Sequence, residues 1–116
     1  MKNGNTKAPQ PLKLDSSLQQ RGELLATVSD KIGCGTYRFE VTGRTQLESL
    51  IRNGLNPWDK FLDIGCGAFC GGYWTMHFLN AGCYHGLEPN VEMFNGGLAY
   101  ILEPELLELK QPKFDH

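Results

Sequence analysis

The feature that most constrains this chain is a short apolar run that ends in an acid and two closely spaced glycines. Residues 60–64 predict a strand that is apolar on both faces, as in the centre of a parallel sheet, and Gly65-Cys66-Gly67 follows it directly. A second apolar stretch ends in Glu88, 21 positions after Gly67. This spacing is typical of a βαβ unit that brings a carboxylate beside a ribose. The two motifs together therefore predict an α/β fold that binds a nucleoside cofactor.

The composition indicates one small globular domain. The chain has 116 residues, of which 41% are hydrophobic and 21% charged, and this length is too short for two domains. Its net charge of −2 offers no electrostatic support for a nucleic-acid surface. No apolar run approaches the ~18 residues of a membrane span, and no apolar signal-peptide segment follows the basic start. The composition thus gives no evidence for a nucleic-acid or membrane partner, although RNA or DNA could still be a substrate through a module that this chain lacks. We expect a cytoplasmic protein.

Three segments follow from the pattern along the chain. Residues 1–14 have little periodic apolar content and predict a flexible N-terminal tail. Residues 15–58 predict N-terminal helices that precede the sheet, and residues 59–116 predict a cofactor-binding half-domain.

In the second segment we expect two helices with a short extended piece between them. The first helix begins at Ser16 or Ser17 and ends at Gly33, whereas the alternation at residues 37–41 favours an extended conformation. The second helix follows and closes near Asn53-Gly54 with a glycine C-cap.

In the third segment the pattern continues as helix, strand, helix and strand. We expect a helix at about residues 70–80, a strand from Tyr84 to Glu88, and a helix capped by Asn90. Pro104 is expected in the first turn of a short further helix, and residues 114–116 look like the opening of a third strand.

The details of the loop favour one nucleoside ligand over another. A dinucleotide fingerprint needs a third glycine where this chain has Cys70, and Asp63 would be unfavourable close to a pyrophosphate. A carboxylate at Asp63 suits a cationic ligand instead, because it gains Coulomb energy near an ammonium and a sulfonium. A dinucleotide, or a glycine turn with no ligand, remains the alternative reading.

These residues resemble the class I S-adenosylmethionine-dependent methyltransferases over about residues 41 to 98. The matching strings are Leu62-Asp63-Ile64-Gly65-Cys66-Gly67 and Tyr84-His85-Gly86-Leu87-Glu88-Pro89-Asn90. The resemblance implies S-adenosyl-L-methionine as the cofactor and methyl transfer as the reaction. It implies that the backbone of Gly65, Cys66 and Gly67 lines the methionine part and that Glu88 binds the ribose hydroxyls. Asp63 would orient the loop and the amino group. The resemblance names no methyl acceptor and no catalytic residue for this chain.

The chain departs from the family pattern in its loop. The commonest family loop has a third glycine where this chain has Phe69, and a glycine pair, Gly71-Gly72, comes later. The helix after the loop is therefore expected to begin near Gly71. Arg44 is a candidate for the methionine carboxylate if its helix packs beside the loop, although a solvated arginine is the more common case.

The cysteines are expected to be reduced thiols. Cys34, Cys66, Cys70 and Cys83 show neither a CxxC pair nor the spacing of a disulfide framework. Loop and strand positions would not place Cys66 and Cys70 around a tetrahedral metal, so no metal site is expected.

The resemblance also predicts that the sheet is incomplete. A doubly wound sheet of this kind has about five to seven strands, but only 28 residues (116 minus 88) follow Glu88. We therefore expect a Rossmann-like doubly wound parallel sheet truncated at the C-terminus, with about two to three strands and flanking helices. Its open edge would be covered by a protein partner or by self-association. The alternative function is a non-catalytic remnant or interaction module, and a less favoured one is an NAD-binding fragment.

Overall fold

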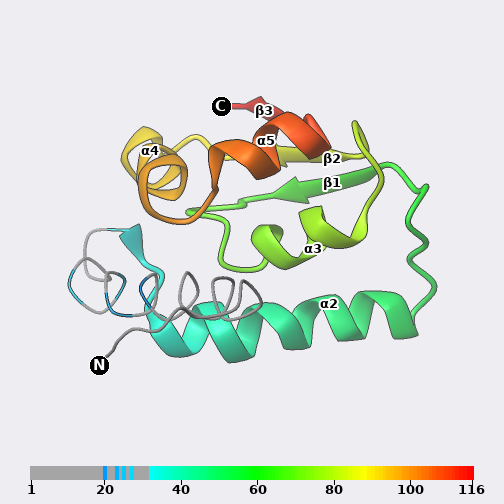
Figure 1. The fold of residues 1–116 in the computed structure, drawn as a ribbon, viewed down its shortest axis with the longest axis horizontal. Coiled ribbons are helices and arrows are strands. Elements are labelled where there is room, and N and C mark those ends of the chain that lie inside the picture. The colour runs from blue at the N-terminus through cyan, green and yellow to red at the C-terminus, as the bar shows by residue number, and fades with distance from the viewer. Residues whose placement is uncertain (1–19, 21–22, 24, 26, 28–31) are drawn as a thin grey trace, which may run out of the picture.

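The computed structural model describes Gln20, Glu23, Leu25, Thr27 and residues 32–116. The expected tail at residues 1–14 and most of the expected first helix lie outside these described residues. The described elements form a small parallel sheet with helices packed against it (Figure 1). In chain order they are the π-helix η1 (Arg38–Thr42), α2 (Gly43–Arg52), β1 (Phe61–Ile64), α3 (Gly72–Phe78), β2 (Tyr84–Leu87), α4 (Val91–Tyr100), α5 (Pro104–Lys110) and β3 (Lys113–Asp115).

The three strands are parallel and lie in the order β1-β2-β3. The register pairs Ile64 with Leu87 and Leu87 with Asp115, so the carboxyl ends of all three strands meet at one edge. Each crossover moves one strand in the same direction, and right-handed crossovers of this kind put their helices on one face. The predicted α/β class is confirmed, with an incomplete sheet of three strands.

One face of the sheet has no helix over it in the described part of the chain. On β1, the side chains of Phe61 and Asp63 are half-buried, whereas Leu62 and Ile64 are 53% and 73% exposed. The expectation that β1 is apolar on both faces is correct for its composition, but only one of these faces is covered. The bare face therefore presents apolar side chains beside the free edge of β1.

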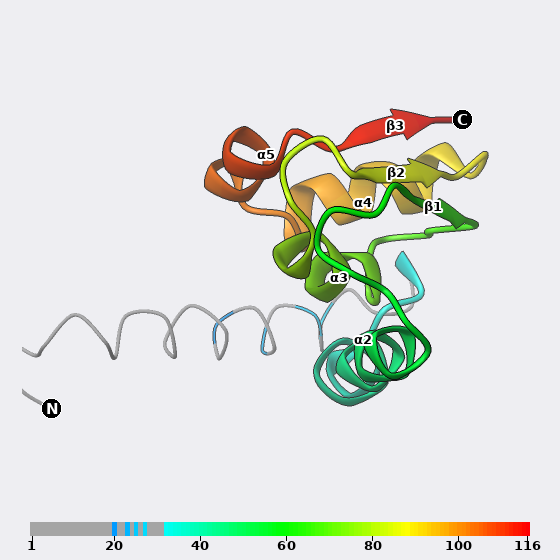
Figure 2. The same cartoon turned by 90° about the vertical axis from the view of Figure 1, so that its right-hand side faces the viewer.

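Helix α2 forms a further layer. In both views it lies on the side of α3 that faces away from β1 (Figure 2). Phe39, just before α2, packs its ring 5.1 Å from the centroids of both Tyr73 and Trp74. Trp74 Nε1 also donates a hydrogen bond of 2.7 Å to the Phe39 carbonyl oxygen. These contacts hold the segment before α2 against α3.

The expectation of an extended piece at residues 37–41 is wrong, since this segment is helical and continues into α2. The alternation of apolar residues suggested a strand, but only Phe39 is buried. Tyr37 and Val41 are 71% and 43% exposed. A single anchoring side chain is compatible with a helix, and no strand among the described residues pairs with this segment to favour the extended form.

Other predicted elements are confirmed with small shifts. Helix α2 ends at Arg52 and is followed by Gly54 at φ +108°. The side chain of Asn90 caps α4 by accepting a hydrogen bond from the Met93 N–H. Pro104 occupies the first turn of α5, and β3 is present one residue earlier than expected.

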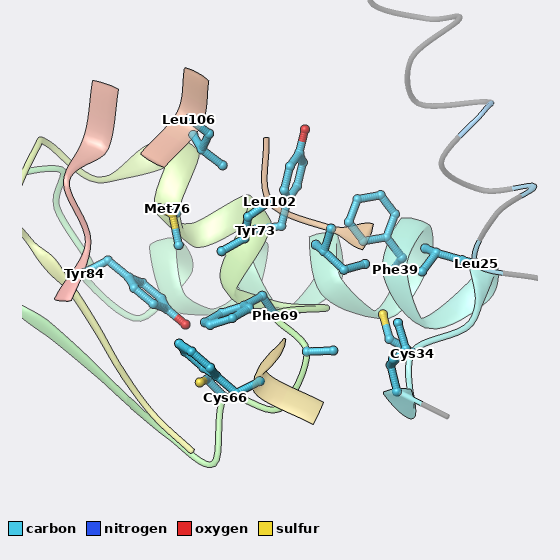
Figure 3. Close-up of a cluster of buried hydrophobic side chains, with 14 of the residues drawn as sticks. Leu25, Cys34, Phe39, Cys66, Phe69, Tyr73, Met76, Tyr84, Leu102 and Leu106 are labelled. Carbon is cyan, nitrogen blue, oxygen red and sulfur yellow. The ribbon is translucent and has the colours of Figure 1, made fainter. Parts of the chain in front are cut away.

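The core lies between the sheet and the helices that cover it. Phe69 is fully buried at its centre, and Figure 3 shows its side chain next to that of Tyr84. The Phe69 ring centroid lies 6.4 Å from that of Tyr84, 5.7 Å from Phe94 and 5.2 Å from Phe114. One residue of the loop after β1 thus reaches side chains from β2, α4 and β3.

The prediction that all four cysteines are reduced is wrong for one pair. Cys34 and Cys70 form a disulfide across 36 positions of sequence, with Cα atoms 6.0 Å apart. Cys66 and Cys83 are free and buried. Sequence spacing did not indicate the bond, because tertiary packing brings the two cysteines together. Among the described residues, no helix is long and apolar enough to cross a membrane.

Candidate cofactor site

A cavity of about 350 Å³ opens at the carboxyl end of β1. Its floor is the loop of residues 63–68 and the two residues Cys70 and Gly71 before α3. The opposite wall includes Arg38, Thr42 and Gln46 from η1 and α2. Its volume is at the lower end of the range for small-molecule sites, and its place at the carboxyl edge of a parallel sheet is typical of ligand sites in α/β folds.

The two loop glycines have left-handed backbone conformations. Gly65 has φ +75° and Gly67 has φ +57°, a region that side-chain-bearing residues rarely adopt. A Cβ added at Gly65 would meet nothing within 4 Å, so the backbone there faces open space. A Cβ added at Gly67 would lie 3.2 Å from Met93 Cε. Glycine at Gly65 therefore serves the turn and leaves the backbone open to a ligand.

Glu88 holds this loop in place. Its side chain is buried, with the residue 7% exposed. One carboxylate oxygen accepts a 2.7 Å hydrogen bond from the Gly67 N–H, and the other accepts a 3.0 Å bond from the Asn90 N–H. Glu88 itself does not line the cavity. Each carboxylate oxygen has a second lone pair, so acceptor capacity for a ribose hydroxyl remains. The ribose role of Glu88 stays a prediction.

Asp63 lines the cavity and is held in place by Tyr84. The buried Tyr84 hydroxyl donates a 2.6 Å hydrogen bond to Asp63 Oδ2. Burial raises the pKa of the Asp63 carboxyl above its usual value, the Tyr84 hydrogen bond opposes this rise, and the nearby Glu88 charge adds to it. Burial and the Asp63 charge also raise the pKa of the Tyr84 phenol, which therefore stays protonated and keeps donating.

Cys66 contributes its backbone to the site, and its thiol is not a nucleophile at neutral pH. Burial, together with the charges of Asp63 and Glu88, raises the pKa of this thiol to about 12. The sulfur packs against β2, where a Cβ added at Gly86 would lie 3.0 Å from Cys66 Sγ. The role of the Cys66 backbone toward a ligand stays a prediction.

The cation on the cavity wall is Arg38, which sequence reasoning missed. Arg38, Thr42 and Gln46 are spaced four residues apart, so they lie on one face of the continuous helical segment. The Arg38 guanidinium also donates a 3.1 Å hydrogen bond from Nη1 to the Gly33 carbonyl oxygen. Arg38 was not predicted because residues 37–41 were expected to be an extended piece separate from the helix that follows. Only a continuous helix aligns Arg38 with Thr42 and Gln46 along the cavity.

Arg44, the predicted candidate for the methionine carboxylate, lies outside the cavity. Its guanidinium carbon sits 5.0 Å from the centroid of the Trp74 ring, and its Nε donates to the Glu40 carbonyl oxygen. Arg44 thus makes these contacts on the surface of α2 and does not line the cavity.

Phe69 explains why the loop departs from the three-glycine pattern. It has φ +69°, the left-handed conformation in which glycine is favoured. Holding a phenylalanine there costs about 1–2 kcal/mol. Full burial of its ring returns about 1.5–3 kcal/mol, and the residue is 0% exposed. The chain thus keeps the backbone path that a third glycine would follow and gains a core side chain.

The glycine pair before and in α3 offers a matched test of this packing. A Cβ at Gly72 would overlap the Tyr84 hydroxyl and lie 3.0 Å from Tyr84 Cζ, whereas one at Gly71 would overlap only the end of the Gln46 side chain. We expect Gly72→Ala to lower the free energy of unfolding by about 1–3 kcal/mol in urea titrations. Gly71→Ala should change it much less, because Gln46 can rotate away. Equal losses in the two variants would contradict this packing.

Comparison with protein-family models, with curated proteins and with solved structures found no match in any of the three. In the described part of the chain, no group of three or more His, Cys, Asp or Glu side chains is placed to hold a metal ion.

Proposed function

We propose that this chain carries the S-adenosyl-L-methionine-binding half of a class I methyltransferase. The observation that carries the proposal is the charge arrangement around the glycine loop. Among the described residues that line the cavity, Asp63 is the only acid and Arg38 the only base. The amino-acid end of the cofactor carries an ammonium and a carboxylate, which these two side chains complement. The open backbone at Gly65, two residues after Asp63, supports the same assignment.

When bound, the cofactor supplies an electrophilic methyl group on its sulfonium. The residues of this chain would bind and orient it: Asp63 the ammonium, Arg38 the carboxylate, and the loop backbone the methionine chain. Methyl transfer depends mainly on in-line positioning of the acceptor atom against the methyl group. The proposal assigns no acceptor and no catalytic residue. We place the protein in the cytoplasm.

A dinucleotide fits the cavity less well. A pyrophosphate at the loop would bring its negative charges toward Asp63, and the cavity wall offers a single guanidinium to balance them. Parallel calorimetric titrations with S-adenosylhomocysteine and with NAD distinguish the two ligands. Heat with NAD alone would overturn the proposal.

We expect Asp63→Asn to weaken S-adenosylhomocysteine binding by about 10- to 100-fold, because it removes one charge-assisted contact to the ammonium. The amide oxygen still accepts the Tyr84 hydrogen bond, so the fold is kept. Asp115→Asn is the matched control, since Asp115 ends β3 and pairs with His85. Isothermal titration calorimetry measures all three proteins.

The pH dependence of binding tests whether the charge of Asp63 contributes to the affinity. The pKa of Asp63 is raised in the free protein, and a bound ammonium would lower it. Affinity is therefore full above the free-state pKa and is lost as the pH falls through it. The asparagine variant should lack this loss, and an identical pH profile in both proteins would contradict the role of Asp63.

The bare sheet face favours a second candidate function, an interaction module. Leu62 and Ile64 are exposed beside the free edge of β1, and such an edge readily pairs with another chain. If the folded protein gives no heat with S-adenosylhomocysteine and elutes as a dimer or complex, this second candidate replaces the first.

A further inference from the structure

We propose that Cys34 and Cys70 form a redox site that couples thiol–disulfide exchange to ligand binding in the cavity. The inference rests on the proposed function for the identity of the ligand. The disulfide itself is independent of that function, since it joins two segments whatever the cavity binds. Both cysteines line the cavity, Cys34 from the segment before η1 and Cys70 from the loop before α3.

The two cysteines belong to different walls. Cys34 lies between Gly33 and Gly35, in the segment that leads into η1, and is 1% exposed. Cys70 follows the glycine loop directly and is half-buried, two residues before α3 begins. Their Cα atoms lie 6.0 Å apart, within the usual range for a disulfide. The bond therefore ties the segment before η1 to the glycine loop.

A chain of contacts leads from the disulfide to the ligand-facing guanidinium. Cys34 is bonded along the chain to Gly33, and the carbonyl oxygen of Gly33 accepts the 3.1 Å hydrogen bond from Arg38 Nη1. The Phe39 N–H donates a 3.0 Å bond to the Gly35 carbonyl oxygen on the other side of Cys34. Fixing Cys34 therefore fixes the carbonyl that orients Arg38.

Reduction would free this segment and leave the rest of the wall in place. Phe39 remains held by Tyr73 and Trp74 through ring packing and the Trp74 hydrogen bond. The part released is the stretch around Cys34, which has glycine on both sides and therefore a large conformational freedom to regain. The oxidised form is thus preorganised for the ligand and the reduced form is not.

The exchange reaction needs only a small thiol such as glutathione. Its thiolate attacks Cys70 Sγ, the more accessible sulfur, which breaks the bond to Cys34 and forms a mixed disulfide. A second thiol attacks the mixed disulfide and releases the oxidised small molecule. Two small thiols are oxidised to one disulfide, and the cysteines become two thiols that carry the two protons. The free cysteines do not compete, since Cys66 and Cys83 are both buried.

A redox site also reconciles the disulfide with the expected compartment. In reducing compartments, protein disulfides are usually transient and serve catalysis or redox sensing. Because attack on Cys70 comes from the cavity, a bound ligand would shield the bond. Linkage requires that the ligand favour the oxidised form by the same factor by which oxidation favours the ligand.

The test compares ligand affinity in the two redox states of the full chain. Protein equilibrated with oxidised glutathione is expected to bind S-adenosylhomocysteine about 10-fold more tightly than protein treated with dithiothreitol, a factor typical of allosteric coupling. Saturating S-adenosylhomocysteine should slow the reduction of the Cys34–Cys70 bond, followed by alkylation and mass spectrometry. Equal affinities in both states would overturn the coupling. Alkylation of Cys34 and Cys70 in the oxidised sample would overturn the disulfide.

Two variants serve as controls. Cys34→Ser/Cys70→Ser should bind S-adenosylhomocysteine with the affinity of the reduced protein, and dithiothreitol should not change that affinity. In Cys83→Ser, dithiothreitol should lower the affinity as it does in the wild type. If the double variant does not fold, the effect of saturating S-adenosylhomocysteine on the rate of disulfide reduction, which starts from the folded oxidised protein, decides the question.

A ligand-free measurement separates this inference from the proposed function. Reduction should speed hydrogen exchange at the Phe39 amide more than at the Phe61 amide, which donates to the Cys83 carbonyl oxygen and reports the loss of global stability. Absence of binding in both redox states would overturn the proposed function. Equal changes at the two amides would overturn the redox site whatever the ligand result.

Discussion

Glu88→Ala is expected to lower the free energy of unfolding by about 3 kcal/mol and to abolish detectable binding of S-adenosylhomocysteine. The substitution leaves two backbone donors, the N–H groups of Gly67 and Asn90, without their buried acceptor. A buried donor that loses its partner costs about 1–3 kcal/mol. The loop then loses the contact that holds Gly67, so the cavity loses its shape as well. Urea unfolding and calorimetry measure the two effects.

Glu108→Ala is the matched control for this prediction. Glu108 is an exposed glutamate in α5, and its loss should change stability by less than about 0.5 kcal/mol. Glu88→Gln refines the result, because its amide oxygen can still accept one of the two N–H groups while its NH₂ group cannot. We expect the stability and the ligand affinity of Glu88→Gln to lie between those of the wild type and those of Glu88→Ala. If Glu88→Ala is as stable as the wild type, the two hydrogen bonds that Glu88 accepts contribute nothing to stability.

Loss of the Cys34–Cys70 disulfide is expected to lower the free energy of unfolding by about 4 kcal/mol. The bond closes a loop with a sequence separation of 36 residues. In the chain-entropy account, such a cross-link restricts the unfolded chain and thereby stabilises the folded one. Guanidinium unfolding of the oxidised wild type and of Cys34→Ser/Cys70→Ser measures the difference.

The single variants supply an internal check on that number. Cys34→Ser, Cys70→Ser and the double variant should lose nearly the same stability, because either substitution removes the whole bond. Dithiothreitol should lower the stability of the wild type by a similar amount and leave the three variants unaffected. Additive losses in the single variants would mean that the cysteines act separately and that no bond joins them.

The part of the site that the sequence predicted is the part built by neighbours along the chain. The strand before Gly65, the helix cap at Asn90 and the helix start at Pro104 each depend on residues within one or two turns of each other. The acid at Glu88 was found because a βαβ unit has a nearly constant length. The structure places the Glu88 carboxylate beside the glycine loop, as that spacing implies. The carboxylate accepts a hydrogen bond from the Gly67 N–H, however, and does not line the cavity.

The residues that were missed or misplaced are those whose neighbours come from elsewhere in the chain. Arg38 reaches the cavity because residues 38–42 are helical, and that helix is held by Phe39 against Tyr73 and Trp74. Alternating apolar residues predicted a strand there, since the pattern carries no information about which partner the segment meets.

The sequence by itself determined the α/β class, the glycine loop after β1 and the acid that follows β2, because backbone conformation at glycine and the length of a crossover are local properties. Only the tertiary structure decided which arginine faces the cavity, that Phe69 takes the conformation of a missing glycine, and that Cys34 meets Cys70. Each of these depends on packing between segments that are distant in sequence. Burial and proximity supply the free energy for such contacts, and neither can be read from spacing along the chain.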